Sequence, residues 1–504
     1  MFLEHRVFDG IYEEDRGVPV FKAYLAGKWV VNKELSDLRT PIDGSLVARV
    51  TQVPAPQLDE LMNLMHDKGR SAIRSLPGNQ RMRVFLKTAE LLKETQKDFI
   101  SVLVKGGGKP VNNAKGEVAA TIDRLEKTGM EFGYITGQYI PGDWDQETIG
   151  SEAIVKREPI GILFAISSFN YPLFISMTKI IPALLLGNAV ILKPASAVPL
   201  AAIMMARLFE KAGLPKEALA VLPIRGRDTT RILQDKRVRA VSFTGSTGIG
   251  QQILQTAGIK QFHLELGGKD PAIVLKDAPI DATVDKVVKG IISNAGQRCD
   301  AIRMVIVEQE QYDAFRERLI DKISKLEPKD PTKDETAVMG PLIDEESAKM
   351  VEAGYNDAVA KGGRALVPFK RNGTFVWPCL IEIPAESVKN LMAYQEDIFG
   401  PLALLIKSKS EEEAIDIANG TVFGLDAAIF GLDEARMRRI ARKLEVGAVF
   451  LNDAPKHGIG YFPFGGMKDS GIGREGLGYS VHQLTTTKSI ITSFRGRGVW
   501  DFDY

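Results

Sequence analysis

IGILFAISSFNYPLFISMTKIIPALLLGNAVILKP, residues 160–194, decides the fold of this chain. It begins with a short apolar run, continues as an apolar helix through Leu186, and ends in a second run, NAVILKP at 188–194. Each run is apolar nearly throughout, as a strand buried on both faces must be. A strand, a helix and a second strand joined by short loops therefore predict two parallel strands with a crossover helix.

The same alternation continues on the C-terminal side. PLAAIMMARLFEKAG (199–213) predicts a helix, ALAVLPI (218–224) a strand, and VRAVSFTGS (238–246) another strand after a polar helix. A doubly wound parallel sheet with helices on both faces follows, which is the architecture of dinucleotide-binding domains. A second alternating segment begins near Leu266 and predicts a second α/β domain.

The flanking segments have other patterns. Residues 1 to about 50 are strand and turn material, with YLAGKWV (24–30) as a hairpin at a sheet edge. Residues 56–107 show the spacing of amphipathic helices until GGGKP (106–110) interrupts them. The tail from Thr485 is β-rich, and its unpaired edges favour pairing with another element or subunit.

Composition excludes several classes of function. Hydrophobic residues make up 44% of the 504 residues and charged residues 26%, as in ordinary soluble globular proteins. Sixty-five basic against 64 acidic residues argue against a nucleic-acid or membrane-surface role. Two cysteines cannot form a disulfide framework, and residues 1–17 lack the apolar stretch of a signal peptide. We therefore expect a cytoplasmic protein with no membrane span.

Cys299 is the first candidate for chemistry. It lies in NAGQRCDAIR (294–303), where a predicted helix ends and the strand RMVIVE begins. A thiol at such a position, with Arg298 beside it, could have a lowered pKa and act as a nucleophile. Taken alone, a free cysteine is more often a small buried hydrophobe.

Two further stretches carry groups that could assist a nucleophile. HLELGGKDP (263–271) places Glu265 between apolar neighbours, where partial desolvation would raise its pKa and suit it to general-base catalysis. SFNYP (168–172) holds Asn170 in a loop after a strand, where its amide could donate to an oxyanion. A solvated strand carboxylate and a turn asparagine are the alternatives for these two residues.

VSFTGSTGIGQQI (241–253) has the form of a phosphate-binding turn. Gly245 and Gly250 permit close backbone approach, and Ser246 or Thr247 can cap the helix that follows. Its spacing is not the usual G-x-G-x-x-G, and such a turn can be a plain strand–helix connection. Lys193 ends the strand of NAVILKP, at the edge where open α/β sheets bind ligands.

Seven short motifs occur together in an order that resembles the aldehyde dehydrogenase superfamily. They are SFNYP, VILKP, FTGS, LELGG, GQRC, EDIFGP and FPFGGMKDSG, and the resemblance extends from YLAGKWV to the tail. Within the superfamily, five segments resemble the archaeal non-phosphorylating glyceraldehyde-3-phosphate dehydrogenases: DWDQETIG (143–150), NYPLF (170–174), GQRCDAI (296–302), NDAPKHGIGYFPFGG (452–466) and RGRGVW (495–500).

The resemblance implies an aldehyde dehydrogenase fold in a homotetramer. It assigns residues 1–136 and 158–265 to a dinucleotide-binding domain and residues 266–470 to a catalytic domain. Residues 137–157 and 484–504 would form a small β oligomerisation extension.

The resemblance also implies a mechanism. Cys299 would be the nucleophile, and Asn170 and the backbone N–H of Cys299 would form the oxyanion hole. Attack on the aldehyde gives a thiohemiacetal, hydride transfer to the nicotinamide gives a thioester, and Glu265 activates the water that releases the acid. Relatives that pass the acyl group to coenzyme A lack a base at the position of Glu265, so hydrolysis is expected.

The expected cofactor is NADP, with NAD as the second choice. NAD-preferring relatives have a glutamate three residues after the strand-end lysine, and this chain has Ser196, which leaves Lys193 able to pair with a 2′-phosphate. Arg225 and Arg227 could add charge. Asp397 replaces the family glutamate that holds the nicotinamide ribose, unless Glu396 takes that role. The other expected cofactor contacts are Ile166, Ser167, Gly226, Thr244, Gly245, Ser246, Gly250, Leu266, Gly267 and Phe399.

For the substrate, Arg124, Tyr171 and Arg298 match positions that face the phosphorylated aldehyde in the resembling group, and a structural ion pair is the alternative for Arg298. His457 stands where some members have an arginine, and a neutral histidine is a poorer anion partner. We expect oxidation of D-glyceraldehyde 3-phosphate to 3-phosphoglycerate without a metal. The archaeal relatives suggest regulation by a sugar phosphate, for which the sequence shows no separate site. The alternatives are another small aldehyde (lactaldehyde, glyceraldehyde or a semialdehyde) and a non-catalytic protein of the same fold.

Overall fold

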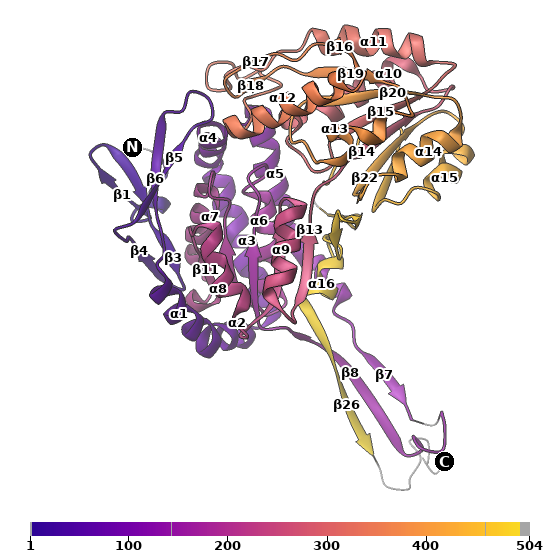
Figure 1. Ribbon diagram of the computed structural model, residues 1–504. Helices are drawn as coiled ribbons and strands as arrows, with labels where there is room; N and C mark the ends of the chain where they lie inside the picture. Colours follow the sequence, from indigo (N-terminus) through magenta and orange to yellow (C-terminus); the bar gives the residue numbers. More distant parts are fainter. Residues whose placement is uncertain (1–2, 143, 459, 494–504) are drawn as a thin grey trace.

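The computed structural model describes residues 3–142, 144–458 and 460–493. The chain opens with a short helix, η1 (Arg6–Phe8), and a four-stranded sheet at one side of the molecule (Figure 1). In sheet order its strands are β1 (Tyr12–Asp15), β2 (Val18–Phe21), β6 (Leu46–Thr51) and β5 (Leu35–Arg39).

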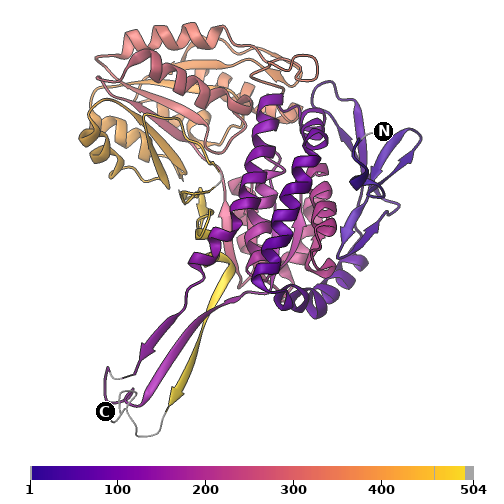
Figure 2. The same cartoon turned by 180° about the vertical axis from the view of Figure 1, so that it is seen from behind.

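A helical segment follows the N-terminal sheet. Its α-helices carry an apolar stripe that packs inward, and Figure 2 shows the long members side by side over one face of the central sheet. GGGKP interrupts the helices as predicted, although α4 continues through Gly107 and the break itself is residues 108–110. The elements are α1 (Ala55–Leu64), η2 (Met65–Gly69), α2 (Arg70–Ser75), α3 (Gly78–Glu94), α4 (Gln96–Gly107), α5 (Val111–Lys127) and η3 (Thr128–Tyr134).

The central sheet has eight strands, and the five from β13 to β11 are parallel. The predicted hairpin of YLAGKWV forms β3 and β4 at one edge. In sheet order the strands are β25 (Gly471–Ile472), β13 (Gln261–Glu265), β12 (Val238–Thr244), β9 (Ile162–Ile166), β10 (Ala189–Lys193), β11 (Leu219–Val221), β3 (Ala23–Leu25) and β4 (Lys28–Val30).

Both faces of the central sheet are buried. Along β9, Leu163 and Ala165 join a core with α3 to α7, while Phe164 and Ile166 join a second core with α1, α8 and α9. Alternate side chains point to opposite faces, which explains why these strands are apolar throughout. The covering elements of this segment are α6 (Phe174–Leu185), α7 (Leu200–Lys211), η4 (Lys216–Ala218), η5 (Gly226–Asp228), α8 (Thr229–Gln234) and α9 (Thr247–Ala257).

A second sheet of seven strands lies above the first in Figure 1. All neighbouring pairs are parallel except the one made by the edge strand β16. In sheet order the strands are β16 (Arg364–Val367), β19 (Cys379–Ile383), β20 (Leu402–Ser408), β15 (Ile302–Glu308), β14 (Asp270–Val274), β22 (Asp426–Phe430) and β23 (Ala448–Leu451).

Helices cover the second sheet, and short elements connect it. The helices are α10 (Ile280–Ile292), α11 (Tyr312–Ser324), α12 (Glu345–Ala360), α13 (Met392–Gln395), α14 (Glu411–Asn419) and α15 (Glu434–Ala441). The short elements are η6 (Ser293–Gly296), β17 (Arg371–Asn372), β18 (Phe375–Val376), η7 (Val388–Asn390), β21 (Phe423–Gly424) and β24 (Met467–Lys468). The last helix, α16 (Tyr479–Leu484), packs against the core of the central sheet. None of the described helices is long and apolar enough to cross a bilayer. The predicted doubly wound sheet and second α/β unit are confirmed.

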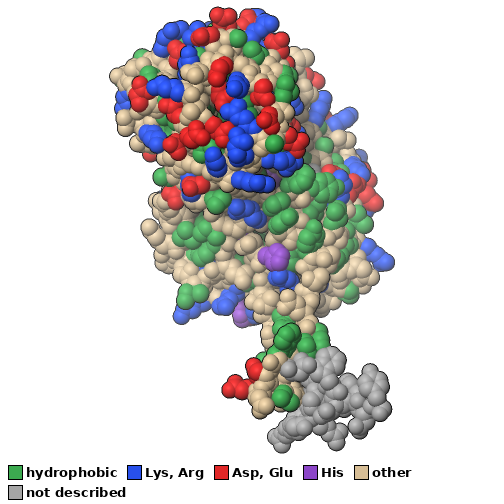
Figure 3. Space-filling view, turned by 90° about the vertical axis from the view of Figure 1, so that its right-hand side faces the viewer, with side chains coloured by type: hydrophobic (Ala, Val, Ile, Leu, Met, Phe, Trp, Pro, Cys, Tyr) green, Lys and Arg blue, Asp and Glu red, His purple; other side chains and the backbone are tan. Residues whose placement is uncertain are grey.

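A three-stranded arm projects from the body (Figures 1 and 2). It consists of β7 (Gln138–Pro141), β8 (Ser151–Pro159) and β26 (Thr485–Ser493), and β26 pairs with β8 along its whole length. The β-rich tail is therefore confirmed through Ser493. RGRGVW and Asp143 of DWDQETIG lie outside the described residues. Figure 3 shows hydrophobic side chains at the surface of the arm.

Candidate functional site

Cys299 lies in the loop between α10 and β15, as the sequence predicted. The loop begins with two residues in the left-handed backbone conformation, Asn294 and Ala295, with φ of 53° and 55°. The Asn294 amide donates to the backbone oxygen of Asn170 at 3.3 Å, which ties the loop to the segment after β9. A Cβ on Gly268 would lie 2.2 Å from the backbone oxygen of Cys299, so only glycine permits this close approach.

Cys299 opens onto a cavity of about 850 Å³. The cavity follows the carboxyl ends of β9, β10 and β12, where open α/β sheets bind ligands. Its lining includes Ile166, Ser167, Asn170, Lys193, Gly226, Arg227, Thr244, Gly245, Ser246, Thr247, Gly248, Leu266, Cys299, Glu396, Asp397 and Phe399.

Two hydrogen-bond donors at this cavity are unused. The Asn170 Oδ1 atom accepts from Ser168 Oγ at 2.8 Å and from the Tyr171 N–H at 3.2 Å. These bonds orient the amide, and its Nδ2 donates to no described residue; the same holds for the N–H of Cys299. A pair of free donors beside a thiol could stabilise an oxyanion formed on a carbon that the sulfur attacks.

The expected lowering of the Cys299 pKa by Arg298 is wrong. Burial raises the pKa of the thiol well above its usual range, and the negative charges of Asp300 and Glu265 raise it further. Arg298 does not offset them, because its guanidinium donates to Asp300 Oδ2 at 2.6 Å and to the Pro455 oxygen at 2.9 Å. The sequence shows Arg298 and Asp300 on either side of Cys299, but not that the two side chains pair.

Glu265 ends β13 and is 3% exposed. Burial raises the pKa of its carboxyl, and the charge of Glu475 raises it further. Thr244 Oγ1 donates to Oε2 at 3.4 Å, and the Nε2 atom of His457 lies 3.8 Å from Oε1. Partial desolvation was the sequence-based argument for a general base, and the raised pKa agrees with it.

Glu265, His457 and Glu475 are the side chains in the described part of the chain that could ligate a metal ion, since their ligand atoms lie within 4.8 Å of one another. The Lys179 ammonium lies 3.9 Å from Glu475 and is fully buried. That permanent positive charge opposes a divalent cation, so we interpret the group as buried ion pairs.

The N-terminus of α9 faces the cavity. Gly245, Ser246 and Thr247 line it, and Ser246 is the N-cap without a side-chain hydrogen bond to the helix. The first N–H groups of the helix are thus left for a phosphate. Gly250 does not line the cavity: a Cβ there would lie 2.5 Å from Leu266, so this glycine serves helix–strand packing.

Lys193 lies in the cavity wall, and burial lowers the pKa of its ammonium to about 8. Its Nζ donates to Ser196 Oγ at 3.4 Å, so the two residues are neighbours as expected. Ser196 and Arg225 line a separate, smaller hollow, and Arg225 pairs with Glu34 at 2.6 Å. The arginine in the main cavity is Arg227.

Glu396 and Asp397 both line the far side of the cavity. Asp397 packs against Gly267, where a Cβ would lie 2.8 Å from its Oδ2. Phe399 also lines the cavity and meets the edge of Phe169 at 6.0 Å between ring centroids. Either carboxylate is therefore available to sugar hydroxyls.

The cations expected to face a substrate phosphate already have partners. Arg124 is 1% exposed and pairs with Glu131 at 2.5 Å. Tyr171 lies beneath the Lys109 ammonium, 4.1 Å from its ring centroid, and burial raises the pKa of its phenol to about 12. Neither residue lines the cavity, and Arg298 pairs with Asp300.

Arg303 is a residue that the sequence analysis missed. It is 2% exposed and donates to the backbone oxygens of Gly296, Arg298 and Gly400. These bonds hold both sides of the Cys299 loop at the start of β15. An arginine at the head of an otherwise apolar strand was the available signal.

Comparisons with known proteins agree with this geometry. Residues 29–490 match the Aldehyde dehydrogenase family. The chain is 34% identical to the NADP-dependent glyceraldehyde-3-phosphate dehydrogenase of Streptococcus equinus, over 94% of this chain and 98% of that protein. It is 32% identical to the lactaldehyde dehydrogenase of Methanocaldococcus jannaschii, over 93% and 100%. The crystal structure of NADP-dependent glyceraldehyde-3-phosphate dehydrogenase from Bacillus halodurans with NADP superposes with a TM-score of 0.89 at 31% identity, covering 94% of this chain and 99% of that one.

Proposed function

Because this chain belongs to the aldehyde dehydrogenase family, we propose that it oxidises D-glyceraldehyde 3-phosphate to 3-phosphoglycerate with NADP. The family makes it an oxidoreductase that acts on aldehydes. The observation that carries the proposal is the placement of the Cys299 thiol and the free Asn170 amide on one cavity large enough for a dinucleotide.

In the proposed mechanism, the Cys299 thiol gives up its proton to solvent in the cavity, and the thiolate sulfur attacks the aldehyde carbon to form the oxyanion of a thiohemiacetal. The new oxyanion accepts hydrogen bonds from Asn170 Nδ2 and from the Cys299 N–H, the two unused donors. NADP, when bound, supplies the hydride acceptor. Glu265 then takes a proton from the water that hydrolyses the Cys299 thioester, and no acyl phosphate forms.

The lining of the cavity suits NADP. The N-terminus of α9 offers N–H groups to the pyrophosphate, and Glu396 or Asp397 offers a carboxylate to a ribose. Lys193 and Arg227 supply positive charge, and position 196 carries no acid that would repel a 2′-phosphate. The Streptococcus and Bacillus relatives are both named as NADP-dependent.

A second candidate substrate is an unphosphorylated aldehyde such as lactaldehyde. One observation favours it: Arg124 and Arg298 are already paired with Glu131 and Asp300, so a phosphate would have to compete with an acid at each. The Methanocaldococcus relative is named as a lactaldehyde dehydrogenase.

The test measures reduction of NADP and of NAD with glyceraldehyde 3-phosphate in phosphate-free buffer, with lactaldehyde and glyceraldehyde in parallel. We expect NADP reduction that needs no inorganic phosphate and has the highest kcat/KM with the phosphorylated aldehyde. A higher kcat/KM for lactaldehyde would transfer the assignment to the second candidate. No reduction with any aldehyde would overturn the proposed function.

We further propose that the arm made by β7, β8 and β26 joins subunits into a homotetramer. Ile154, Ile490 and Ile491 are 44%, 47% and 71% exposed on it, and an apolar surface on a protruding sheet favours contact with another copy.

A further inference from the structure

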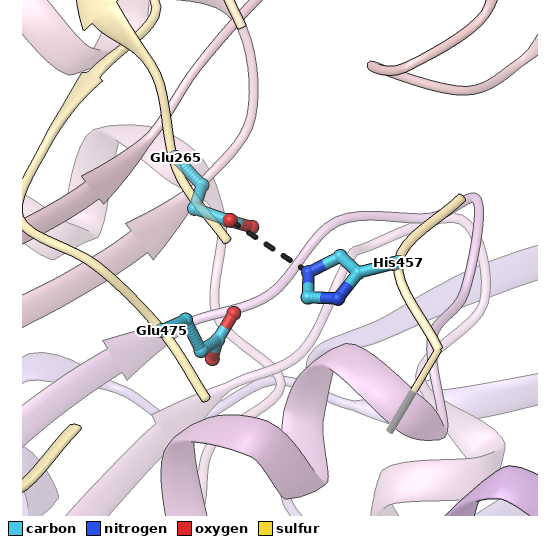
Figure 4. Close-up of side chains that lie close together, drawn as sticks. All are labelled: Glu265, His457 and Glu475. Carbon is cyan, nitrogen blue, oxygen red and sulfur yellow. Dashed lines mark ion pairs between the residues drawn. The ribbon is translucent and has the colours of Figure 1, made fainter. Parts of the chain in front are cut away.

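His457 meets Glu265 from another part of the chain. Glu265 ends β13, whereas His457 lies in the loop after β23, 192 positions further along (457 − 265). Figure 4 shows the imidazole directed at the carboxylate, with Nε2 and Oε1 3.8 Å apart and Glu475 beside them. This contact is not used in the proposed substrate-binding role of His457.

The other neighbours of Glu265 leave one of its carboxylate oxygens without a hydrogen bond. Thr244 Oγ1 reaches Oε2 at 3.4 Å, while Oε1 has no hydrogen bond within the described residues. Glu475 adds a second negative charge, but the Lys179 ammonium lies 3.9 Å from Glu475 and compensates it. Lys179 also lowers the pKa of Glu265, but it lies beside Glu475, so His457 is the cation that faces Oε1.

The ring of His457 is held in a fixed orientation. It packs at a tilt of 36° against Phe464, with 3.4 Å between centroids, and meets the edge of Phe174 at 6.2 Å. Its buried Nδ1 has no hydrogen-bond partner among the described residues, and Nε2 is the nitrogen that faces a charged group. The side chain is still 23% exposed, which lets it exchange a proton with solvent.

We propose that His457 is a positioning residue for Glu265: its imidazolium holds the carboxylate through Oε1 and keeps it ionised for the hydrolytic step. In that step a water oxygen bonds to the acyl carbon of the Cys299 thioester and the C–S bond breaks. Cys299 leaves as a thiolate, and the water proton remains on Glu265. The inference rests on the proposed function, because it requires a thioester on Cys299.

The directions of the pKa shifts agree with this role. Burial opposes charge on His457, but Glu265 and Glu475 raise its pKa above the ordinary value. Burial and Glu475 raise the pKa of Glu265, whereas His457 lowers it. The other charged or titratable groups that interact with this pair are Lys179, His263, Cys299, Asp300 and Asp426.

The sign of the pH dependence follows. When His457 is protonated, Glu265 stays ionised to lower pH, so the base is available in the acidic range. Without that charge, the pKa of Glu265 is higher, so the carboxylate is already protonated in the acidic range and hydrolysis slows in that range. At a pH above both pKa values the imidazole is neutral and the carboxylate is ionised with or without His457. The hydrolysis rates with and without the His457 charge are then expected to be equal.

The experiment isolates thioester hydrolysis from cofactor and substrate. The activated ester p-nitrophenyl acetate acetylates Cys299 and releases p-nitrophenolate, so the burst reports acylation and the later steady phase reports deacylation. We would measure both phases from about pH 5.5 to pH 9 for the wild type, His457→Gln and His457→Arg. Glu265→Gln provides the baseline without the base, and His66→Gln, at an exposed helix, is the matched control.

We expect His457→Gln to slow deacylation at about pH 6 by roughly tenfold, the order expected when one opposite charge near 4 Å from a buried carboxylate is removed. The burst should not slow, because a protonated Glu265 no longer raises the pKa of the Cys299 thiol, and the deacylation rate should rejoin that of the wild type near pH 9. His457→Arg keeps a permanent cation and should retain the wild-type rate at pH 6.

Three outcomes would overturn the inference. Deacylation by His457→Gln could follow the wild-type pH profile, or it could fall equally at every pH with the burst intact, which would show that His457 does not act through its charge. His457→Arg could also fail to restore the rate at pH 6. A rise in KM for glyceraldehyde 3-phosphate with unchanged deacylation would instead return His457 to phosphate binding. Failure of the wild type to oxidise any aldehyde, with normal ester hydrolysis, would count against the proposed function alone.

Discussion

Cys299 is a thiol whose surroundings oppose its ionisation. Burial and the charges of Asp300 and Glu265 favour the neutral form, and Arg298 is occupied by Asp300. A neutral thiol is a weak nucleophile, which protects it from indiscriminate alkylation and oxidation in the protein without ligands.

We predict that iodoacetamide modifies Cys299 slowly at about pH 7 and that the rate still climbs at about pH 9. The raised pKa means that the thiolate fraction keeps growing through this range. Mass spectrometry of the alkylated peptide measures the alkylation rate at each pH. A rate that reaches its plateau already near pH 7 would contradict the raised pKa.

Cys299→Ser is the control for that measurement. Cys379, the other cysteine, is 0% exposed, so labelling should vanish in the variant. Oxidation of aldehydes should vanish with it if Cys299 is the nucleophile.

Cofactor choice also belongs to the residue scale. We predict that Ser196→Glu raises the KM for NADP by roughly ten- to a hundredfold, the effect of losing one charge-assisted contact. Position 196 lies 3.4 Å from Lys193 Nζ, so a glutamate would neutralise the lysine and repel the 2′-phosphate. Steady-state kinetics with NADP and NAD measure the preference. Ser196→Gln has the same length without the charge; if it has the same effect, size and not charge sets the preference.

At the scale of elements, the Cys299 loop is held between two sheets by hydrogen bonds with residues outside it. Asn294 ties it to the segment after β9, and Arg303 ties it to the start of β15 and to the Gly400 backbone. The loop contains left-handed residues, so it needs these external bonds to keep one conformation.

We predict that Arg303→Met lowers the free energy of unfolding by roughly 3 kcal/mol, because buried backbone oxygens of Gly296, Arg298 and Gly400 lose their donor. The loop should also open to solvent, which speeds alkylation of Cys299. Thermal unfolding and the labelling rate measure both effects. Arg303→Lys keeps the charge but loses the fork of donors, so an intermediate result is expected. Unchanged stability in both variants would mean that other contacts hold the loop.

At the scale of the whole molecule, the arm extends away from both sheets and exposes apolar side chains (Figure 3). Ile154 of β8 faces Ile490 of β26 directly in the antiparallel register. A cross-strand pair of opposite charges at these positions would keep the arm paired while removing its apolar surface.

We predict that the double variant Ile154→Lys, Ile490→Glu dissociates the assembly into smaller species, as measured by light scattering coupled to size-exclusion chromatography. Ile154→Val with Ile490→Val keeps the apolar surface and should keep the wild-type mass. An unchanged mass in the charged variant would show that the arm does not carry the assembly.

The sequence by itself determined the architecture. The apolar runs of β9 and β10 and the helix between them reflect burial on both faces, and this is a local property that a linear pattern records. The order of motifs also located Cys299 between α10 and β15 and placed Asn170 after β9, because the loops at strand ends follow from the strand order.

Only the tertiary structure decided the charges and partners of the site. Arg298 precedes Cys299, yet it pairs with Asp300. Arg227 lines the main cavity, whereas Arg225 lines a separate hollow. Glu265 and His457 are 192 positions apart and meet across 3.8 Å. The physical reason is that a pKa or an ion pair depends on every group within a few ångströms in space and on the water excluded around it. Spacing along the chain records neither.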